Sequence, residues 1–409
     1  MARILITNNT LAHRSGTELY VRDLATGLLA RGHNPVAYSS MLGPVARELE
    51  DAGVQIVSSL EQVERPPDLI HGHHHIETMT ALLRFHSTPG VYFCHGSTPW
   101  QEEPPAHPRI LRYVAVDEAC YDRIVSKNAI PEELVQTIHN FADLNRFQRR
   151  ASLPQKPERA LIFSNNVSPA SAAAMAIRSA CERAGLQLDI IGMSANNTSV
   201  SPESILGNYD VVFAKARAAI EALAVGAAVI LCDTIGLGGM VTTLELPRLR
   251  ALNFGLRALP RPVDADAIYQ EIARYDPLEA AEVCTFMRSN AGLDSALDQI
   301  EALYNEVLKE HSERSALPGA DEAAAASEYV RYLGSLAKAQ DNMAVDMYIP
   351  AAAYEAVCSQ LRNSEAELKR IRGTLGWRLL SLFGPIKKRL IQPIGEKLRL
   401  TAEREPAGK

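Results

Sequence analysis

The chain has 409 residues, which is enough for two or three domains with sizeable hydrophobic cores. Hydrophobic residues make up 47% and charged residues 22% of the sequence, as is typical of a globular protein. The formal net charge of −6 argues against general nucleic-acid binding, because that function requires a basic surface. The six cysteines are widely and irregularly spaced, which fits neither a zinc motif nor a disulfide framework and favours reduced thiols in the cytoplasm.

The first predicted strand begins at Arg3, which leaves no room for a signal peptide. No apolar run reaches the ~18 residues that a membrane span requires. From these two observations we expect a soluble, cytoplasmic protein that at most lies on a membrane surface.

The first 145 residues alternate between short apolar strands and amphipathic helices. Strands are predicted at 2–9, 34–40, 66–74, 88–96 and 112–118, a helix at 19–32, and a helix followed by a strand within 43–59. This alternation with short loops predicts a parallel sheet covered on both faces. Ligands of such sheets bind at the carboxyl ends of the strands, where this pattern places Ser15, Gly16, His71, His73, His95, Gly96 and Asp117.

The rest of the chain predicts a second α/β set and a helical tail. Residues 146–159 are charged and contain proline, and they are predicted to be a linker. A second domain is expected over 160–310, with its closing helices at the end. The small, polar stretch 311–328 is predicted to be another linker, and 329–409 a helical tail.

The most informative stretch is 215–239, KARAAIEALAVGAAVILCDTIGLGG. An alanine-rich helix that carries Glu221 ends at Gly226. An apolar β-branched strand follows, and then a glycine-rich turn. A helix, a buried strand and a glycine loop at strand ends are the components of an α/β nucleotide site.

In this order the segments resemble the donor-sugar half of retaining family 4 glycosyltransferases, which have the GT-B fold. Over roughly residues 3–310 the chain has further segments similar to that family: SGTELYVRDLATGLLARGHNPVAYS, DLIHGHHH, VYFCHG, AVDEACYDRIV and IHNFADLNRF. The resemblance implies an α/β fold with two Rossmann-like doubly wound domains and a helical C-terminal appendage. It also implies transfer of a sugar from a UDP- or GDP-sugar to a glycan or lipid-linked acceptor, without metal or cofactor, with Glu221 on the ribose of the donor.

The sequence departs from the family at two places in the second half. Where the family has an arginine and a lysine that clamp the donor pyrophosphate, this chain reads FSNNVSPA, without a basic residue. Where the family has a second glutamate, eight positions before Glu221, this chain has Phe213. These departures leave two alternatives open: a catalytically inactive nucleotide-sugar-binding scaffold, and a GT-B sugar-nucleotide epimerase.

A bound pyrophosphate must be met by cations or by oriented N–H groups. Ser15, Gly16 and Thr17 precede a predicted helix and are expected to offer backbone amides at its positive end. Lys215 and Arg217 lie at the start of the helix that carries Glu221, and they are candidates for the missing cations. The structural alternatives are an ordinary turn and two solvated charges.

Glu221 lies among small apolar residues, where a carboxylate is costly to bury unless something binds it. A ribose diol offers two hydroxyl donors to one carboxylate. The alternative is an exposed helix residue. The turn glycines Gly236, Gly238 and Gly239 are predicted to let the backbone approach the donor, or else to form a flexible turn.

A run of histidines suggests a metal site at first sight: His71, His73, His74 and His75. Neighbouring residues of a strand point to opposite faces, so few of them converge on one ion, and a strand-end or structural role is favoured. His95 follows the apolar strand VYFC and is the candidate catalytic residue, as a hydrogen-bond partner of a sugar hydroxyl or phosphate. Asp264 and Asp266 precede a helical run, which favours a helix N-cap over a metal motif.

The tail from Leu375 alternates apolar and basic residues, with eight basic and three acidic side chains, a local net charge of +5. Trp377 and the leucines near it are expected to enter a lipid headgroup boundary, while the basic residues contact anionic lipid. Residues 375–400 are thus predicted to contact an anionic membrane surface at the inner face of the cell membrane. The alternative is a helix docked on the protein or on a second copy.

Overall fold

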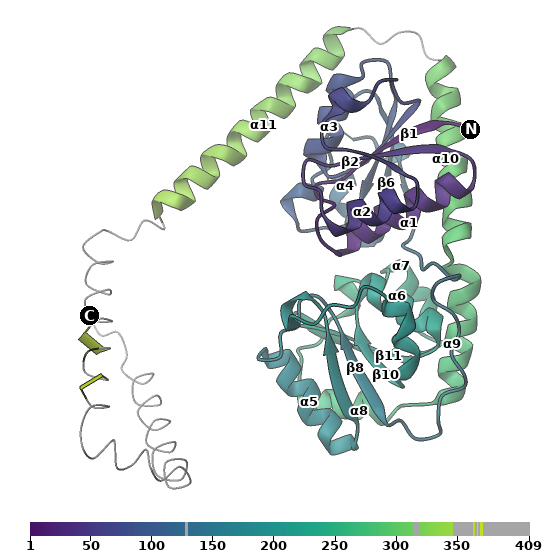
Figure 1. The fold of residues 1–409 in the computed structure, drawn as a ribbon, viewed down its shortest axis with the longest axis vertical. Helices are drawn as coiled ribbons and strands as arrows, with labels where there is room; N and C mark the ends of the chain where they lie inside the picture. The colour runs from purple at the N-terminus through teal and green to yellow at the C-terminus, as the bar shows by residue number, and fades with distance from the viewer. Residues whose placement is uncertain (127–129, 314–318, 347–362, 365, 367–368, 371–409) are drawn as a thin grey trace. The chain divides into compact units, whose positions relative to one another are not determined.

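The computed structural model describes residues 1–126, 130–313, 319–346, 363–364, 366 and 369–370 (Figure 1). The chain divides into two units, residues 1–330 and 331–409. The first unit contains two sheets, each belonging to one α/β domain, and this confirms the predicted fold class. In the second unit the described residues up to Asp346 continue helix α11 (Gly319–Asp346).

The N-terminal domain is built on a seven-stranded parallel sheet with the order β3-β2-β1-β4-β5-β6-β7. The strands are β1 (Arg3–Thr7), β2 (Asn34–Tyr38), β3 (Gln55–Val57), β4 (Leu69–His73), β5 (Gly90–Cys94), β6 (Ile110–Ala115) and β7 (Val135–Thr137). The connecting helices are α1 (Gly16–Ala30), α2 (Pro44–Asp51), α3 (His75–Arg84) and α4 (Glu118–Val125). Separate hydrophobic clusters contain Ile4 and Ile6 on the one hand and Leu5 on the other, as expected of a strand whose alternate residues face opposite sides.

The C-terminal domain has a five-stranded sheet with the order β12-β11-β10-β8-β9. Its strands are β8 (Arg159–Phe163), β9 (Gln187–Ile191), β10 (Val211–Ala214), β11 (Ala228–Asp233) and β12 (Gly236–Met240). The first four are parallel, and β12 runs antiparallel to β11. The helices are α5 (Ala172–Ala184), α6 (Ala216–Val225), α7 (Leu246–Ala251), α8 (Ala265–Ile272) and α9 (Pro277–Asn290).

The last helix of the predicted C-terminal domain packs on the other domain. Helix α9 contributes Val283 and Met287 to the core of the C-terminal domain, but α10 (Leu293–Glu313) contributes Leu297, Ile300 and Tyr304 to the core of the N-terminal domain. Figure 1 shows α10 beside the N-terminal domain and α9 beside the C-terminal domain. The predicted boundary at residue 310 is therefore wrong, because the apolar face of α10 is buried against the first domain.

The two predicted linkers have different outcomes. Residues 146–158 form no regular helix or strand in the structure, and Phe147 anchors this segment in the core of the C-terminal domain. The predicted linker 311–328 is wrong over 319–328, which belong to α11, because its alanines and glutamates are strong helix formers. The tail segment 375–400 lies outside the described residues.

The five cysteines within the described part of the chain are free and buried. Among the helices that the structure describes, none combines the length and the apolar character that crossing a membrane would require.

Candidate functional site

Four parallel strands of the C-terminal sheet end at one pocket. Ser164 follows β8, Gly192 follows β9, Lys215 follows β10, and β11 ends in Asp233; all four line the pocket. The chain leaves β8 for β9 on one side and then returns to β10 on the other side. The pocket therefore lies where the strand order reverses, the usual ligand position of open α/β sheets.

The pocket has a volume of about 300 Å³, at the lower end of the range for small-molecule sites. The N-terminal domain contributes Arg14, Ser15, Gly16 and Leu19 to its lining. The C-terminal domain contributes, besides the strand-end residues, four residues of α6: Ala216, Arg217, Ala218 and Glu221. Five predicted site residues are thus brought together: Ser15, Gly16, Lys215, Arg217 and Glu221.

Two backbone features shape the pocket wall. A Cβ at Gly192 would lie 1.8 Å from the carbonyl oxygen of Ser164, so only glycine fits where the ends of β8 and β9 meet. Ala216, at the start of α6, has a φ of 47°, which is strained for a residue with a Cβ. Such strain persists where surrounding contacts impose it, and it is concentrated at binding sites.

The start of α6 is the cationic part of the pocket. Lys215 is the N-cap residue, and the first turn of α6 has no acidic side chain. The Nζ atom of Lys215 lies 3.5 Å from the carboxylate of the buried Asp233, which also accepts a hydrogen bond of 2.9 Å from Ser164. The N–H of Ala216 already donates to the carbonyl of Phe254 at 2.7 Å, but those of Arg217 and Ala218 have no acceptor within the helix, so these two groups and the two cations favour an anion.

Glu221 is buried, with 4% of its surface exposed, so the exposed alternative is wrong. Its Oε1 atom accepts a hydrogen bond of 2.8 Å from Nε of Arg217, four residues earlier on the helix. Burial raises the pKa of Glu221, and the charge of Arg217 only partly opposes that effect. Arg217 therefore stabilises this carboxylate at the pocket, while burial disfavours its charged form.

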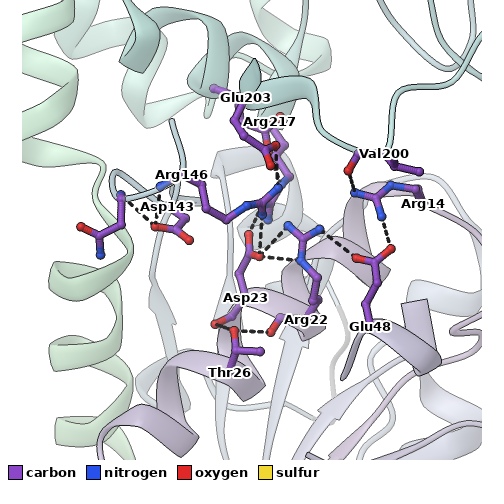
Figure 2. Close-up of polar contacts among 12 residues, drawn as sticks. Arg14, Arg22, Asp23, Thr26, Glu48, Asp143, Arg146, Val200, Glu203 and Arg217 are labelled. Atoms are coloured by element: carbon purple, nitrogen blue, oxygen red, sulfur yellow. Dashed lines mark hydrogen bonds and ion pairs between the residues drawn. The ribbon is translucent and has the colours of Figure 1, made fainter. Parts of the chain in front are cut away.

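Arg217 is not a solvated charge either. Besides Glu221, it contacts the carboxylate of Asp23, which lies on α1 in the other domain. Figure 2 shows that Arg22 and Arg146 also converge on Asp23. Burial would raise the pKa of Asp23, but the charges of Arg217, Arg22 and Arg146 outweigh it and lower the pKa.

The start of α1 differs from the start of α6 in its electrostatics. The buried carboxylate of Glu18 accepts hydrogen bonds from the backbone N–H of His13, at 2.9 Å, and of Ser15, at 2.7 Å. The positive end of α1 is thus already compensated by a charge of the protein itself. The backbone N–H of Ser15 is therefore already bound to Glu18, and an anion contact at Ser15 and Gly16 stays a prediction.

His95 lies at the carboxyl end of β5, outside the pocket lining. Its Nε2 atom is 2.8 Å from Nδ1 of His73, and its backbone N–H donates to Glu102 at 2.9 Å. Burial lowers the pKa of His95 to about 3, and the charges of His74 and Arg217 act in the same direction. The imidazole is therefore neutral near pH 7.

The other histidines have structural partners. Nδ1 of His71 lies 2.5 Å from the hydroxyl of Tyr304 on α10, and Nδ1 of His74 accepts from the N–H of Asn9 at 3.1 Å. No cluster of metal-ligating side chains occurs among the residues that the structure describes. Asp264 caps α8, accepting from the N–H of Ala267 at 2.9 Å, so the N-cap prediction is confirmed.

The predicted glycine turn is a strand with a packing role. Gly236, Gly238 and Gly239 belong to β12 and lie outside the pocket lining, as does Thr17. A Cβ at Gly236 or Gly238 would meet a backbone carbonyl oxygen at 2.4 or 2.3 Å. Glycine is needed there for close backbone packing, so the prediction of donor contacts finds no support.

Sequence reasoning missed several pocket residues. Four of them follow or end strands of the second sheet: Asn165, Asn166, Gly192 and Asp233. The rule that ligands bind at the carboxyl ends of parallel strands, which was applied to the first domain, predicts these residues when it is applied to the second domain as well. Asp23 carries no such signal, because its partner Arg217 is 194 residues away in the chain.

Comparison with known proteins agrees with the observed fold. Residues 14–146 match the family model described as Glycosyltransferase Family 4. A glycosyltransferase from Rickettsia africae ESF-5 matches with a TM-score of 0.54 and 15% identity, covering 75% of this chain and 98% of that one. HepE from Anabaena, in complex with UDP-glucose, matches with a TM-score of 0.55 and 14% identity, over 75% and 100% of the two chains.

Sucrose-phosphate synthase from Thermosynechococcus elongatus matches with a TM-score of 0.52 and 13% identity, over 76% and 100% of the two chains. A search of curated proteins found no match. At these identities the solved structures show the fold, and the family model matches about a third of the chain. Residues 14–146 are thus similar to the Glycosyltransferase Family 4 model, and the chain has the GT-B fold of these solved structures.

Proposed function

We propose that the protein transfers a sugar from a UDP- or GDP-sugar to a glycan or lipid-linked acceptor. The observation that carries the proposal is the pocket at the strand reversal, where Glu221, Lys215 and Arg217 face Ser15 and Gly16 of the other domain. The proposed assignment puts the ribose on Glu221 and the diphosphate at the start of α6. HepE, which has the same fold, was solved with UDP-glucose, in agreement with a nucleotide-sugar donor.

In the proposed reaction the bond between the anomeric carbon and the diphosphate oxygen breaks, and the diphosphate leaves with the electron pair. An acceptor hydroxyl forms the new bond to that carbon, and its proton passes to the leaving diphosphate. Lys215, Arg217 and the N–H groups of α6 would stabilise the charge that develops on the leaving diphosphate, so that no metal is required. Neutral His95 lies outside the pocket lining and would hydrogen-bond only a sugar hydroxyl that extends beyond the pocket.

A second candidate is a nucleotide-sugar-binding scaffold without catalysis. Two observations favour it. The loop after β8 offers Ser164, Asn165 and Asn166 but no cation, and Phe213 is fully buried in the core rather than facing a donor. Both candidates share the nucleotide site and differ only in turnover.

Product analysis with a panel of UDP- and GDP-sugars separates these candidates and the epimerase alternative. Transfer to an acceptor, or slow donor hydrolysis with release of UDP or GDP, supports the transferase. Saturable binding without turnover supports the scaffold, and a donor with altered sugar stereochemistry supports an epimerase. Failure of every donor to bind would exclude the transferase, the scaffold and the epimerase alike.

We further propose that residues 375–400 hold the enzyme at an anionic membrane surface, on the inner face of the cell membrane. The support is the sequence, with eight basic and three acidic side chains from Leu375 onward. Binding to anionic vesicles should weaken with added salt without vanishing, because screening acts on the charges and not on apolar burial. A chain truncated before Gly373 that still co-sediments with vesicles would exclude this role.

A further inference from the structure

Asp23 is the point where the two domains meet through charges. It is a buried residue of α1, with 3% of its surface exposed. Its Oδ1 atom accepts hydrogen bonds from Arg22, at 2.8 and 2.7 Å, and lies 3.3 Å from Nη1 of Arg146. Its Oδ2 atom contacts only Arg217 among the ion pairs of the described residues. The Oδ2 atom of Asp23 therefore pairs with Arg217, a residue that lines the pocket.

One nitrogen of the Arg217 guanidinium has no hydrogen-bond partner among the described residues. Its Nε atom donates to Glu221 and its Nη2 atom to Asp23. Its Nη1 atom is buried and has no hydrogen-bond partner among the residues that the structure describes. A buried charged donor without an acceptor is costly, and this one belongs to a side chain that lines the pocket. An anion in the pocket would satisfy it.

The guanidinium group is planar and rigid, so fixing two of its nitrogens fixes the direction of the third. Glu221 holds Nε from the same helix. Asp23 holds Nη2 from the opposite domain (Figure 2). The centroid of the Phe141 ring lies 5.9 Å from the central carbon of the guanidinium, so the ring packs against one face of this group.

We infer that Asp23 is a positioning residue that aims Nη1 of Arg217 at the diphosphate of a bound nucleotide. A side chain of the other domain thereby completes the part of the site that binds the diphosphate. This inference rests on the proposed nucleotide site. It adds that recognition of the diphosphate, and not of the nucleoside, depends on a carboxylate that never touches the ligand.

The test is calorimetry of UDP, GDP, uridine and guanosine with wild type, Asp23→Asn, Arg217→Ala and the double variant. Asp23→Asn should weaken binding of the preferred diphosphate about 10-fold or more, and its nucleoside less than about 2-fold. In the Arg217→Ala background it should have no further effect, because Asp23 acts through Arg217. Equal losses for diphosphate and nucleoside, or independent losses from the two variants, would overturn the inference.

Glu203→Gln is the matched control. Glu203 pairs with Arg146 at 2.8 Å in the same cluster but does not contact Arg217, so this variant should bind diphosphates like wild type. If a melting scan shows that Asp23→Asn does not fold, Asp23→Glu takes its place. It keeps the charge but moves the carboxylate, and it should again weaken the diphosphate selectively. Failure of wild type to bind any diphosphate would instead refute the proposed function.

Discussion

Replacing Glu221 by glutamine tests the ribose contact directly. Glutamine has nearly the same volume, and its carbonyl can still accept from Nε of Arg217, but it lacks the negative charge. Removing one partner of a buried ion pair costs about 3–5 kcal/mol. Since Asp23 still pairs with Arg217, we expect a smaller loss of folding stability and a folded variant.

The effect on binding follows from the hydrogen bonds to the ribose. A hydrogen bond to a charged group contributes about 1.5–3 kcal/mol, which corresponds to roughly 10- to 150-fold in affinity. If Glu221 accepts from the 2′-hydroxyl, wild type should prefer UDP over 2′-deoxy-UDP, or GDP over 2′-deoxy-GDP, within that range. In Glu221→Gln this preference should fall toward unity.

Isothermal titration calorimetry with the matched pair of nucleotides measures both preferences. Glu203→Gln is the control, because it makes the same chemical change in the same ion-pair cluster without touching Arg217. An unchanged preference for the ribonucleotide in Glu221→Gln would refute the assignment of the ribose to this carboxylate, whatever the change in absolute affinity.

Three further predictions concern charge, pH and the pocket wall. The double variant Lys215→Ala, Arg217→Ala should weaken diphosphate binding far more than nucleoside binding in the same titrations; equal losses would mean that neither residue contacts the diphosphate. Burial raises the pKa of Glu102 to about 7, so the stability that this carboxyl contributes is fully present below its ordinary pKa of 4.5 and is lost as pH rises through about 7. Glu102→Gln should therefore gain about 2–3 kcal/mol relative to wild type between about pH 5 and pH 8 in denaturant unfolding, and a constant difference would contradict this. Gly192→Ala should destabilise by about 3 kcal/mol and lower nucleotide affinity, because its Cβ would overlap a backbone carbonyl; Gly207→Ala, whose Cβ would have neighbours no closer than 3.7 Å, is the control and should unfold like wild type.

The sequence predicts much of the fold because its signals are local. Alternating strands and helices imply parallel sheets, and the helix with Glu221, ended by Gly226 in the left-handed conformation, is found as α6 with its glycine cap. The rule that ligands bind at the carboxyl ends of parallel strands places the strand-end residues at the pocket. The domain on which α10 packs is not predictable in this way, because the sequence of an amphipathic helix does not indicate which domain covers its apolar face.

The prediction of the site is limited by long-range partners. The sequence identifies Arg217 as a candidate cation but not its pairing with Asp23, which depends on how the two domains meet. Gly236 and Gly238 illustrate the opposite error. A glycine is needed wherever backbones approach closely, and at these positions the neighbour is another segment of the protein and not a ligand.

The most direct test of the central proposal is a crystal structure of the protein with UDP or GDP, whichever calorimetry shows to bind. We expect the ribose within hydrogen-bond distance of Glu221 and the diphosphate at the start of α6, against Lys215 and Nη1 of Arg217. A nucleotide bound outside this pocket, or a ribose and diphosphate placed with no contact to Glu221 and Arg217, would contradict the account.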